Sequence, residues 1–275
     1  MTQHTVALSG GTTIPLVGLG TWPMDDAESR RVIAEAIEIG YRHVDTAENY
    51  ANETGVGQGI ADSGIDRSEL FVTTKFNRRW HGVELAAEAI GHSLDRLGLD
   101  YLDLALIHWP NPDQDRYVDA WRGLSRLREE GVVRAIGTSN FKPAHVDRLI
   151  AETGVAPEVN QIELHPYLDR AEERAYHAAH GIVTEAWSPL GRGNGLLEQP
   201  LVTSLASKYG VTPGQVLLAW DVVQGIVTIP KSSNPERLRQ NLDIFGIDLD
   251  ADEVASLTAL SAPGVEAVDS DVFGH

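Results

Sequence analysis

Four side chains that could together transfer a proton follow short apolar runs along this chain. The run 43–47 contains Asp45 and leads to Tyr50, while two later runs end at Lys75 and His108. A tyrosine hydroxyl with a pKa of about 10 is a weak acid at neutral pH, but a nearby ammonium lowers that pKa by stabilising the phenolate. Lys75 could supply this charge, and Asp45 could keep the amine protonated. With His108 orienting the acceptor, the set is suited to protonating a carbonyl oxygen.

Taken one at a time, these residues also suit ordinary structural roles. Asp45 could cap a helix, Lys75 could be a surface charge, and His108 or Tyr50 could simply be packed in the core. A shared site therefore requires a fold that brings the ends of several strands together.

The repeating pattern of the chain predicts such a fold. Eight short runs rich in Val, Ile, Leu and Tyr alternate with longer amphipathic stretches, as in the βα units of a parallel sheet. Eight units in about 250 residues match an α/β fold of the (β/α)8 TIM-barrel type better than an open doubly wound sheet, and the working face of such a barrel is the C-terminal end of its strands. The runs begin near Val17, Tyr41, Leu70, Tyr101, Val132, Pro157, Ile182 and Ile226.

Local signals support this prediction. A glycine precedes every run after the first, where a left-handed helix C-cap would release the chain into the next strand. These glycines are Gly40, Gly64, Gly98, Gly131, Gly154, Gly181 and Gly225.

Residues 5–14 predict a β-hairpin that caps the barrel floor, and extra helices are expected toward the C-terminus. Without a linker or low-complexity stretch, residues 1–275 are expected to form a single barrel domain.

Residues in the last loop predict a site for a phosphate-containing ligand. The loop 231–237 combines Lys231, hydroxyl side chains and Arg237 at the start of a helix, where barrels commonly bind phosphate. A capped helix with scattered surface cations is the alternative. The glycine clusters at 18–20, 55–59 and 191–195 do not have the spacing and context of a Rossmann fingerprint.

Composition narrows the possible partners. The chain has 40 Asp and Glu against 22 Lys and Arg, a formal net charge of -18, and no cysteine. This charge would repel nucleic acid and anionic membrane surfaces, so neither is an expected partner. No signal-peptide pattern or long apolar segment is present, and we expect a cytoplasmic monomer that acts on a small molecule.

The motifs around these residues resemble the aldo-keto reductases nearly from end to end. The resemblance is strongest to the bacterial branch that includes 2,5-diketo-D-gluconate reductases. The stretches that carry it are GTW at 20–22, YRHVDTA at 41–47 with Tyr50, NE at 52–53, VG at 56–57, LFVTTK at 70–75, DYLDLALIH at 100–108, GTSNF at 137–141, NQIELHP at 160–166, SPL at 188–190 and IPKS at 229–232.

The resemblance implies an oxidoreductase that reduces aldehydes or ketones with NADPH, which becomes NADP+. Its Asp, Tyr, Lys and His tetrad would be Asp45, Tyr50, Lys75 and His108. The implied cofactor contacts are Ser139, Asn140 and Gln161 at the carboxamide, Trp187 stacked on the nicotinamide, Ser188, Leu190 and Gly191 along the pyrophosphate, Lys231, Ser232 and Arg237 at the 2′-phosphate, and Gln240 and Asn241 near the adenine. Many relatives have Tyr in place of Trp187 and Asn in place of Pro110.

Three tryptophans on the loops after the first, third and fourth strands are expected to wall the substrate cleft. They are Trp22, Trp80 and Trp109, with rim packing as the alternative role. The acidic tail 262–275 either folds over this cleft or is disordered. The physiological carbonyl, the ratio of NADP to NAD use and the oligomeric state stay open.

Two other functions are compatible with parts of the sequence. A metal-dependent barrel hydrolase could use ligands among His43, Asp45, His108, Glu163 and His165. An ammonium on Lys75 close to Asp45 would oppose a divalent ion there, so no metal is expected. A barrel that binds NADPH without turning it over would be a regulatory module, which the complete tetrad disfavours.

Overall fold

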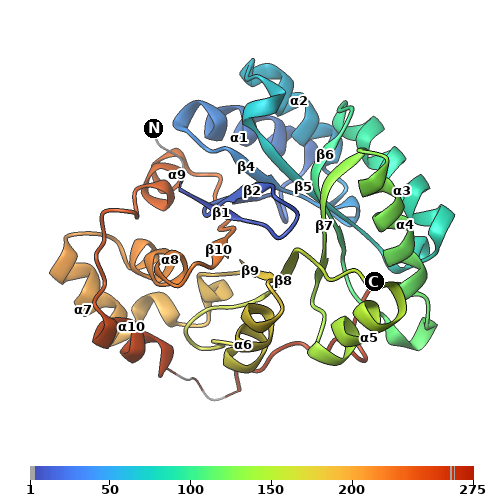
Figure 1. Cartoon of the computed structure of the whole chain (residues 1–275). Coiled ribbons are helices and arrows are strands. Elements are labelled where there is room, and N and C mark those ends of the chain that lie inside the picture. Colours follow the sequence, from blue (N-terminus) through green and yellow to red (C-terminus); the bar gives the residue numbers. More distant parts are fainter. Residues whose placement is uncertain (1–3, 261, 263) are drawn as a thin grey trace.

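The computed structural model describes residues 4–260, 262 and 264–275, and its centre is a curled sheet of eight parallel strands (Figure 1). Each strand pairs with the next in sequence order, and all eight coincide with the predicted runs. The strands are β3 (Leu19–Gly20), β4 (His43–Asp45), β5 (Phe71–Phe76), β6 (Leu102–Ile107), β7 (Val133–Ser139), β8 (Val159–Glu163), β9 (Val183–Trp187) and β10 (Val227–Thr228).

The first and last strands meet and close the sheet into a barrel. A parallel bridge joins Val17 to Thr228, and the amide of Gly18 donates to the carbonyl of Thr228 at 2.9 Å. The amide of Gly20 extends this seam by donating to the carbonyl of Pro230 at 3.3 Å. A Cβ on Gly20 would lie 2.9 Å from the carbonyl oxygen of Ile229, so the close approach of the two strands requires glycine here.

Helices surround this barrel, as the alternating pattern predicts (Figure 1). The seven glycines that precede strands all have positive φ angles, between 64° and 130°. Gly40, Gly64, Gly98 and Gly154 are helix C-caps, as predicted, and the other three follow the C-cap residue by one position. The helices are α1 (Asp26–Ile39), α2 (Glu53–Ser63), α3 (Val83–Leu97), α4 (Tyr117–Glu129), α5 (Pro143–Thr153), α6 (Ala171–Ala179), α7 (Pro200–Tyr209), α8 (Pro213–Val223), α9 (Pro235–Leu242) and α10 (Ala251–Thr258).

The predicted N-terminal hairpin closes one end of the barrel. Its strands β1 (Thr5–Ala7) and β2 (Thr13–Pro15) pair antiparallel. Leu8 and Ile14 are buried in one apolar cluster with residues at the N-terminal ends of the barrel strands, including Phe71. The opposite end, where the strands terminate, is thereby left as the open face of the barrel. No helix in the described part of the chain is both long and apolar enough to cross a membrane.

Two of the glycines in the cluster 55–59 serve helix packing. The cluster lies within α2, in agreement with the prediction that it is not a nucleotide-binding loop. A Cβ on Gly55 would overlap the backbone of Asp26 in α1, and a Cβ on Gly57 would overlap the backbone of Leu97 at the end of α3. Glycine is required at both positions because the backbones of neighbouring helices touch there.

A pair of alanine substitutions tests this packing. Gly57→Ala is expected to lower the free energy of unfolding by about 2 kcal/mol, because the new methyl forces α2 away from Leu97. Gly91 lies within α3 with open space around it, so Gly91→Ala is expected to raise stability by up to about 1 kcal/mol through helix propensity. Urea denaturation midpoints measure both effects. Equal stabilisation by the two substitutions would contradict the packing role.

Candidate active site

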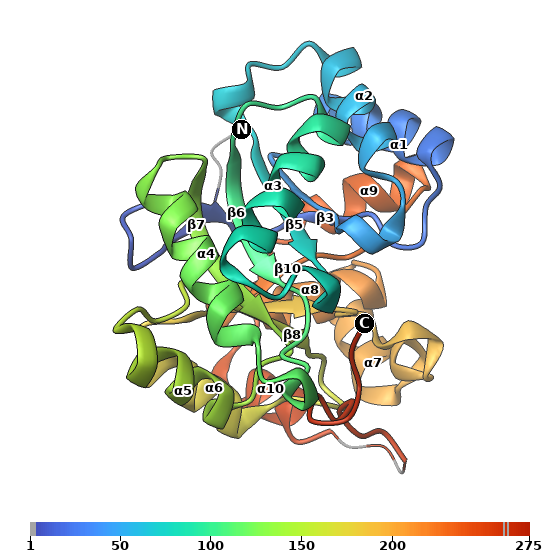
Figure 2. The same cartoon turned by 90° about the vertical axis from the view of Figure 1, so that its right-hand side faces the viewer.

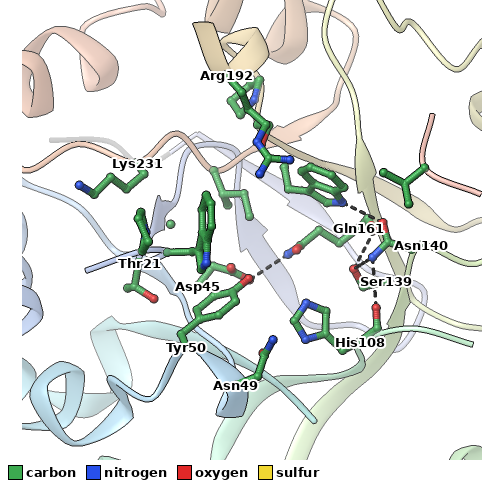
Figure 3. A pocket seen from close by; sticks show the side chains of 18 of the residues that line it. Thr21, Asp45, Asn49, Tyr50, His108, Ser139, Asn140, Gln161, Arg192 and Lys231 are labelled. Carbon is green, nitrogen blue, oxygen red and sulfur yellow. Dashed lines mark hydrogen bonds between the residues drawn. The ribbon is translucent and has the colours of Figure 1, made fainter. Parts of the chain in front are cut away.

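A cavity of about 710 Å³ opens at the C-terminal ends of the barrel strands (Figure 3). Tyr50 and His108 lie on one side of it, and Arg192 lies across from them. The wall combines side chains from the ends of strands with side chains from the loops that follow. The residues predicted from strand ends are thus brought to one place, although they are far apart in sequence.

Lys75 and Asp45 form a fully buried ion pair beside this cavity. The Lys75 ammonium donates to Asp45 Oδ1 at 2.6 Å and to the carbonyl of Thr46 at 3.0 Å. Burial is the largest single influence and disfavours the charged amine, but the neighbouring acidic groups, with Asp45 foremost, together outweigh it and raise the pKa of Lys75 above its usual value. Burial also raises the pKa of Asp45, and Lys75 opposes that rise. Both charges are therefore maintained by their contact.

Tyr50 lies above this ion pair in a 3-10 turn, η1 (Glu48–Tyr50), that directly follows β4. The Lys75 nitrogen is 5.2 Å from the centre of the tyrosine ring, and the His108 ring is 5.9 Å from it. Burial raises the pKa of the Tyr50 phenol above its usual value, while Lys75 lowers it by a smaller amount. Lys75 acts in the predicted direction, but the net shift is opposite to the prediction because the sequence does not reveal the extent of burial. The phenol is therefore protonated at neutral pH, as a proton donor must be.

Buried carboxylates fix the segment that carries Tyr50. Glu48 accepts a hydrogen bond from the Trp80 indole at 2.8 Å and pairs with Arg79, and Glu53 accepts one from the Thr74 hydroxyl at 2.6 Å. Trp80 therefore packs behind this segment and does not line the cavity, in contrast to its predicted place beside the substrate. Its position matches the alternative role in rim packing.

His108 is buried and neutral. Burial, together with the nearby Lys75 ammonium, places the pKa of the His108 imidazole well below its usual value. Its Nδ1 has no hydrogen-bond partner among the described residues. The side-chain amide of Asn140 donates to the His108 carbonyl at 3.1 Å, which connects this strand end to the next one. A neutral imidazole in this position can donate a hydrogen bond to a substrate oxygen without adding charge to the site.

Polar groups from β7, β8 and β9 form the neighbouring wall (Figure 3). The Trp187 indole donates to Asn140 Oδ1 at 2.9 Å, and Asn140 also donates to the Ser139 hydroxyl at 3.0 Å. The Gln161 amide nitrogen donates to two carboxyl oxygens, of Asp45 and Glu185, both at 2.8 Å. Neither bond uses Gln161 Oε1, so the cavity wall offers an amide acceptor that a carboxamide ligand could bind.

Of the remaining residues predicted to bind the cofactor, some line the cavity and others do not. Ser188, Leu190 and Lys231 line the cavity. Gly191, Ser232, Arg237, Gln240 and Asn241 do not line it, and all but Gly191 belong to the last loop or to α9. Arg237 is exposed in the first turn of α9, where the Asn234 side chain accepts hydrogen bonds from two backbone amides. An elongated ligand could therefore extend from the cavity past Lys231 to α9.

Aromatic and cationic groups surround the mouth of the cavity. Trp22 is 51% exposed, and the guanidinium of Arg192 lies 5.3 Å from its ring and 5.7 Å from that of Trp187. Trp109 is buried beside His108 and contacts Phe273 edge to face, with ring centres 4.9 Å apart. The sequence predicts the positions of Trp22 and Trp109 near this cavity, but it does not predict that of Arg192. The only signal for Arg192 is its place in the glycine-rich loop after the seventh strand.

The C-terminal segment 264–275 reaches the cavity, which corresponds to the first of the two alternatives that the sequence leaves open. Figure 2 shows it returning from α10 toward the barrel. Phe273 and His275 line the cavity, and the His275 ring lies 5.0 Å from that of His108. Lys142 holds the segment through Asp269 at 2.6 Å and Asp271 at 2.5 Å.

The geometry of the cavity does not support a metal-binding site. In the ranges 4–260, 262 and 264–275, no three His, Asp or Glu side chains lie close enough together to hold an ion. Asp45 is committed at both oxygens, to Lys75 and to Gln161.

Comparisons with known proteins agree with these observations. A model described as the aldo/keto reductase family matches residues 16–262. A 2,5-diketo-D-gluconic acid reductase B from a Corynebacterium species is 50% identical over 256 residues, which cover 93% of this chain and 92% of the relative. A methylglyoxal reductase of Escherichia coli is 43% identical over 270 residues, covering 98% of each chain.

Solved structures are similar over almost the same length. The crystal structure of a Bombyx mori aldo-keto reductase in complex with NADP has a TM-score of 0.88 and 37% identity, covering 94% of this chain and 92% of that one. An aldo/keto reductase from Brucella melitensis has a TM-score of 0.90 and 45% identity, covering 94% and 99%.

The Lys142 contacts predict that the tail can be released by charge reversal. Lys142→Glu places a negative charge against Asp269 and Asp271. Cleavage after Glu266 by a glutamyl endopeptidase is therefore expected to accelerate about threefold. Arg126→Glu reverses an equally exposed cation paired with Glu84 and serves as the control. Equal cleavage rates in the two variants would contradict the tethering role of Lys142.

Proposed function

Since this chain belongs to the aldo/keto reductase family, we propose that Tyr50 is the proton donor when the protein reduces aldehyde or ketone carbonyls with NADPH. The observation that supports this role most directly is the position of the Tyr50 ring, whose centre is 5.2 Å from the buried Lys75 ammonium and 5.9 Å from the His108 ring. The class of reaction follows from the family to which the chain belongs.

Each member of the tetrad has a separate task in the proposed reaction. When bound in this site, NADPH would supply the hydride for the carbonyl carbon. Tyr50 donates its phenolic proton to the carbonyl oxygen as negative charge develops there, and Lys75 stabilises the resulting phenolate. Asp45 keeps Lys75 charged and in place through their 2.6 Å contact. His108, neutral because it is buried, donates a hydrogen bond that orients the carbonyl oxygen.

The proposed cofactor site extends from the cavity to α9. Ser139, Asn140 and the free oxygen of Gln161 would hold the carboxamide, with Trp187 stacked on the nicotinamide ring. Ser188, Leu190 and Gly191 would follow the diphosphate, and Arg192 adds positive charge there in an otherwise acidic protein. Lys231, Ser232 and Arg237 would hold the 2′-phosphate, and Gln240 and Asn241 would lie near the adenine.

For the substrate we propose a small, polar compound with more than one carbonyl. The cavity combines the aromatic rings of Trp22, Trp109 and Phe273 with the imidazole of His275, so it offers apolar walls and polar anchors together. The names of two relatives, a diketogluconic acid reductase and a methylglyoxal reductase, support the same class. Loss of NADPH absorbance across a panel of aldehydes, ketones and dicarbonyls tests it. Binding of NADPH without turnover of any panel member would instead favour a regulatory module.

Replacing the proposed proton donor tests the central role. Tyr50→Phe removes the phenolic proton but keeps the ring, so the rate of turnover should fall by at least about 100-fold while the affinity for NADPH stays close to that of the parent protein. Steady-state rates and the quenching of tryptophan fluorescence by NADPH measure the two quantities. Reduction at a near-normal rate would remove Tyr50 from this role.

The cofactor preference is tested on α9. Arg237→Ala should weaken NADPH binding about 10-fold, or about 1.4 kcal/mol, because a charge-assisted contact with the 2′-phosphate is lost, and should leave NADH binding unchanged. Arg239→Ala removes an exposed cation from the same helix and should affect neither cofactor. Dissociation constants for NADPH and NADH decide the outcome. Equal weakening of both cofactors by Arg237→Ala would argue against a 2′-phosphate contact.

A further inference from the structure

A second carboxyl group lies beneath the cavity and has no task in the mechanism above. Glu185, on β9, is completely buried. Its Oε2 accepts a hydrogen bond from Gln161 at 2.8 Å. Its Oε1 has no hydrogen-bond partner among the described residues and lies 3.6 Å from His43 Nε2. Because an unpaired polar atom in a protein core costs about 1–3 kcal/mol, the position calls for a functional explanation.

The geometry around Gln161 supplies that explanation. An amide nitrogen carries two hydrogens, and Gln161 directs one to Asp45 Oδ2 and the other to Glu185 Oε2. If Asp45 were the only acceptor, it would accept from just one of these two hydrogens. The Gln161 amide could then still rotate about its Cγ–Cδ bond. With a second acceptor on the other side, both hydrogens are used and the oxygen must point elsewhere, toward the cavity that Gln161 lines.

We propose that Glu185 is a positioning residue that locks the amide of Gln161, so that Gln161 Oε1 faces the cofactor carboxamide and its nitrogen steadies Asp45. The proposal rests on the cofactor role proposed above for Gln161. Glu185 touches neither cofactor nor substrate, and acts only through Gln161 and Asp45.

The titratable and polar groups that face Glu185 inside the barrel come from three other strands. Those groups are Asp45 and His43 on β4, Lys75 on β5 and Gln161 on β8. Burial first, and then the negative charge of Asp45, raise the pKa of Glu185 to about 8. His43 supplies no compensating charge, because burial lowers its pKa to about 3.

Glu185 is accordingly neutral at pH 7 and ionises as the pH rises through about 8. Its second negative charge would then compete with Asp45 for Lys75 and for Gln161. In the fold, the pKa of Glu185 lies above the usual value of 4.5. The stability that its neutral carboxyl group contributes is therefore present below pH 4.5 and is lost as the pH rises through 8. A rise in the dissociation constant for NADPH and a fall in turnover are therefore expected near pH 8.

Two substitutions of Glu185 separate positioning from simple packing. Glu185→Leu removes the acceptor and frees one hydrogen of Gln161, so the dissociation constant for NADPH should rise about 10-fold at pH 7, with a fall in turnover. Glu185→Gln retains an oxygen acceptor but cannot ionise. In Glu185→Gln the dissociation constant for NADPH should stay within about threefold of the parent value. The inflection near pH 8 in the pH profile of NADPH binding and turnover should disappear.

A buried carboxyl elsewhere provides the matched control. Asp221, on α8, accepts a hydrogen bond from the Thr228 hydroxyl at 2.8 Å, and burial raises its pKa well above the usual range. Asp221→Asn should alter thermal stability without changing NADPH affinity or removing the inflection near pH 8. A similar loss of the inflection in this variant would show that Glu185 has no special role.

The remaining outcomes overturn the proposal in distinguishable ways. If Gln161→Leu leaves NADPH affinity unchanged, the proposed cofactor role of Gln161 fails and the role of Glu185 fails with it. If Gln161→Leu weakens binding but a folded Glu185→Leu binds NADPH normally, only the positioning role fails. If Glu185→Leu does not fold, the pH profile of Glu185→Gln decides, and an inflection retained near pH 8 rejects the proposal.

Discussion

The contact between the Lys75 ammonium and the Asp45 carboxylate is the interaction on which the rest of this site depends. Moving an unpaired charge of this size into a protein core costs several kcal/mol, so neither group could remain ionised at this depth alone. Each is held by its partner at 2.6 Å, and Asp45 is held in turn by Gln161. Through these two bonds the strands β4, β5 and β8 are connected inside the barrel. The same few bonds therefore hold the side chains around Tyr50 in place and keep the strands connected inside the barrel.

Much of this arrangement could be predicted from the sequence because parallel strands of a barrel end on one face. Lys75 and His108 stand at the end of apolar runs, so their meeting follows once those runs are recognised as strands. The helix-ending glycines indicate where each strand begins, and their positive φ angles agree with that interpretation. The positions of residues whose direction is set by a regular element could therefore be predicted from the sequence.

Residues on loops were harder to place, because no periodicity fixes the direction of their side chains. Trp80 and Trp109 both follow strands, yet Trp109 lines the cavity and Trp80 turns away to Glu48. Arg192 was missed for the same reason. The acidity of Tyr50 depends on the balance between burial and the Lys75 charge, and the sequence reveals only the second quantity. Loop direction and the degree of burial are properties of the packed molecule, and they limit how far a site can be predicted from its residues.

The seam between Val17 and Thr228 also determines when the site can exist. These residues are more than 200 positions apart, and the cavity takes wall residues from both sides of the seam, such as Trp22 and Lys231. A chain growing from its N-terminus on the ribosome can therefore form the Lys75 and Asp45 side of the barrel well before it can form a nucleotide pocket. Until the last strand emerges, the edge of β3 has no neighbour, and such unpaired strand edges are prone to aggregation. The binding site is consequently one of the last parts of the molecule to be completed.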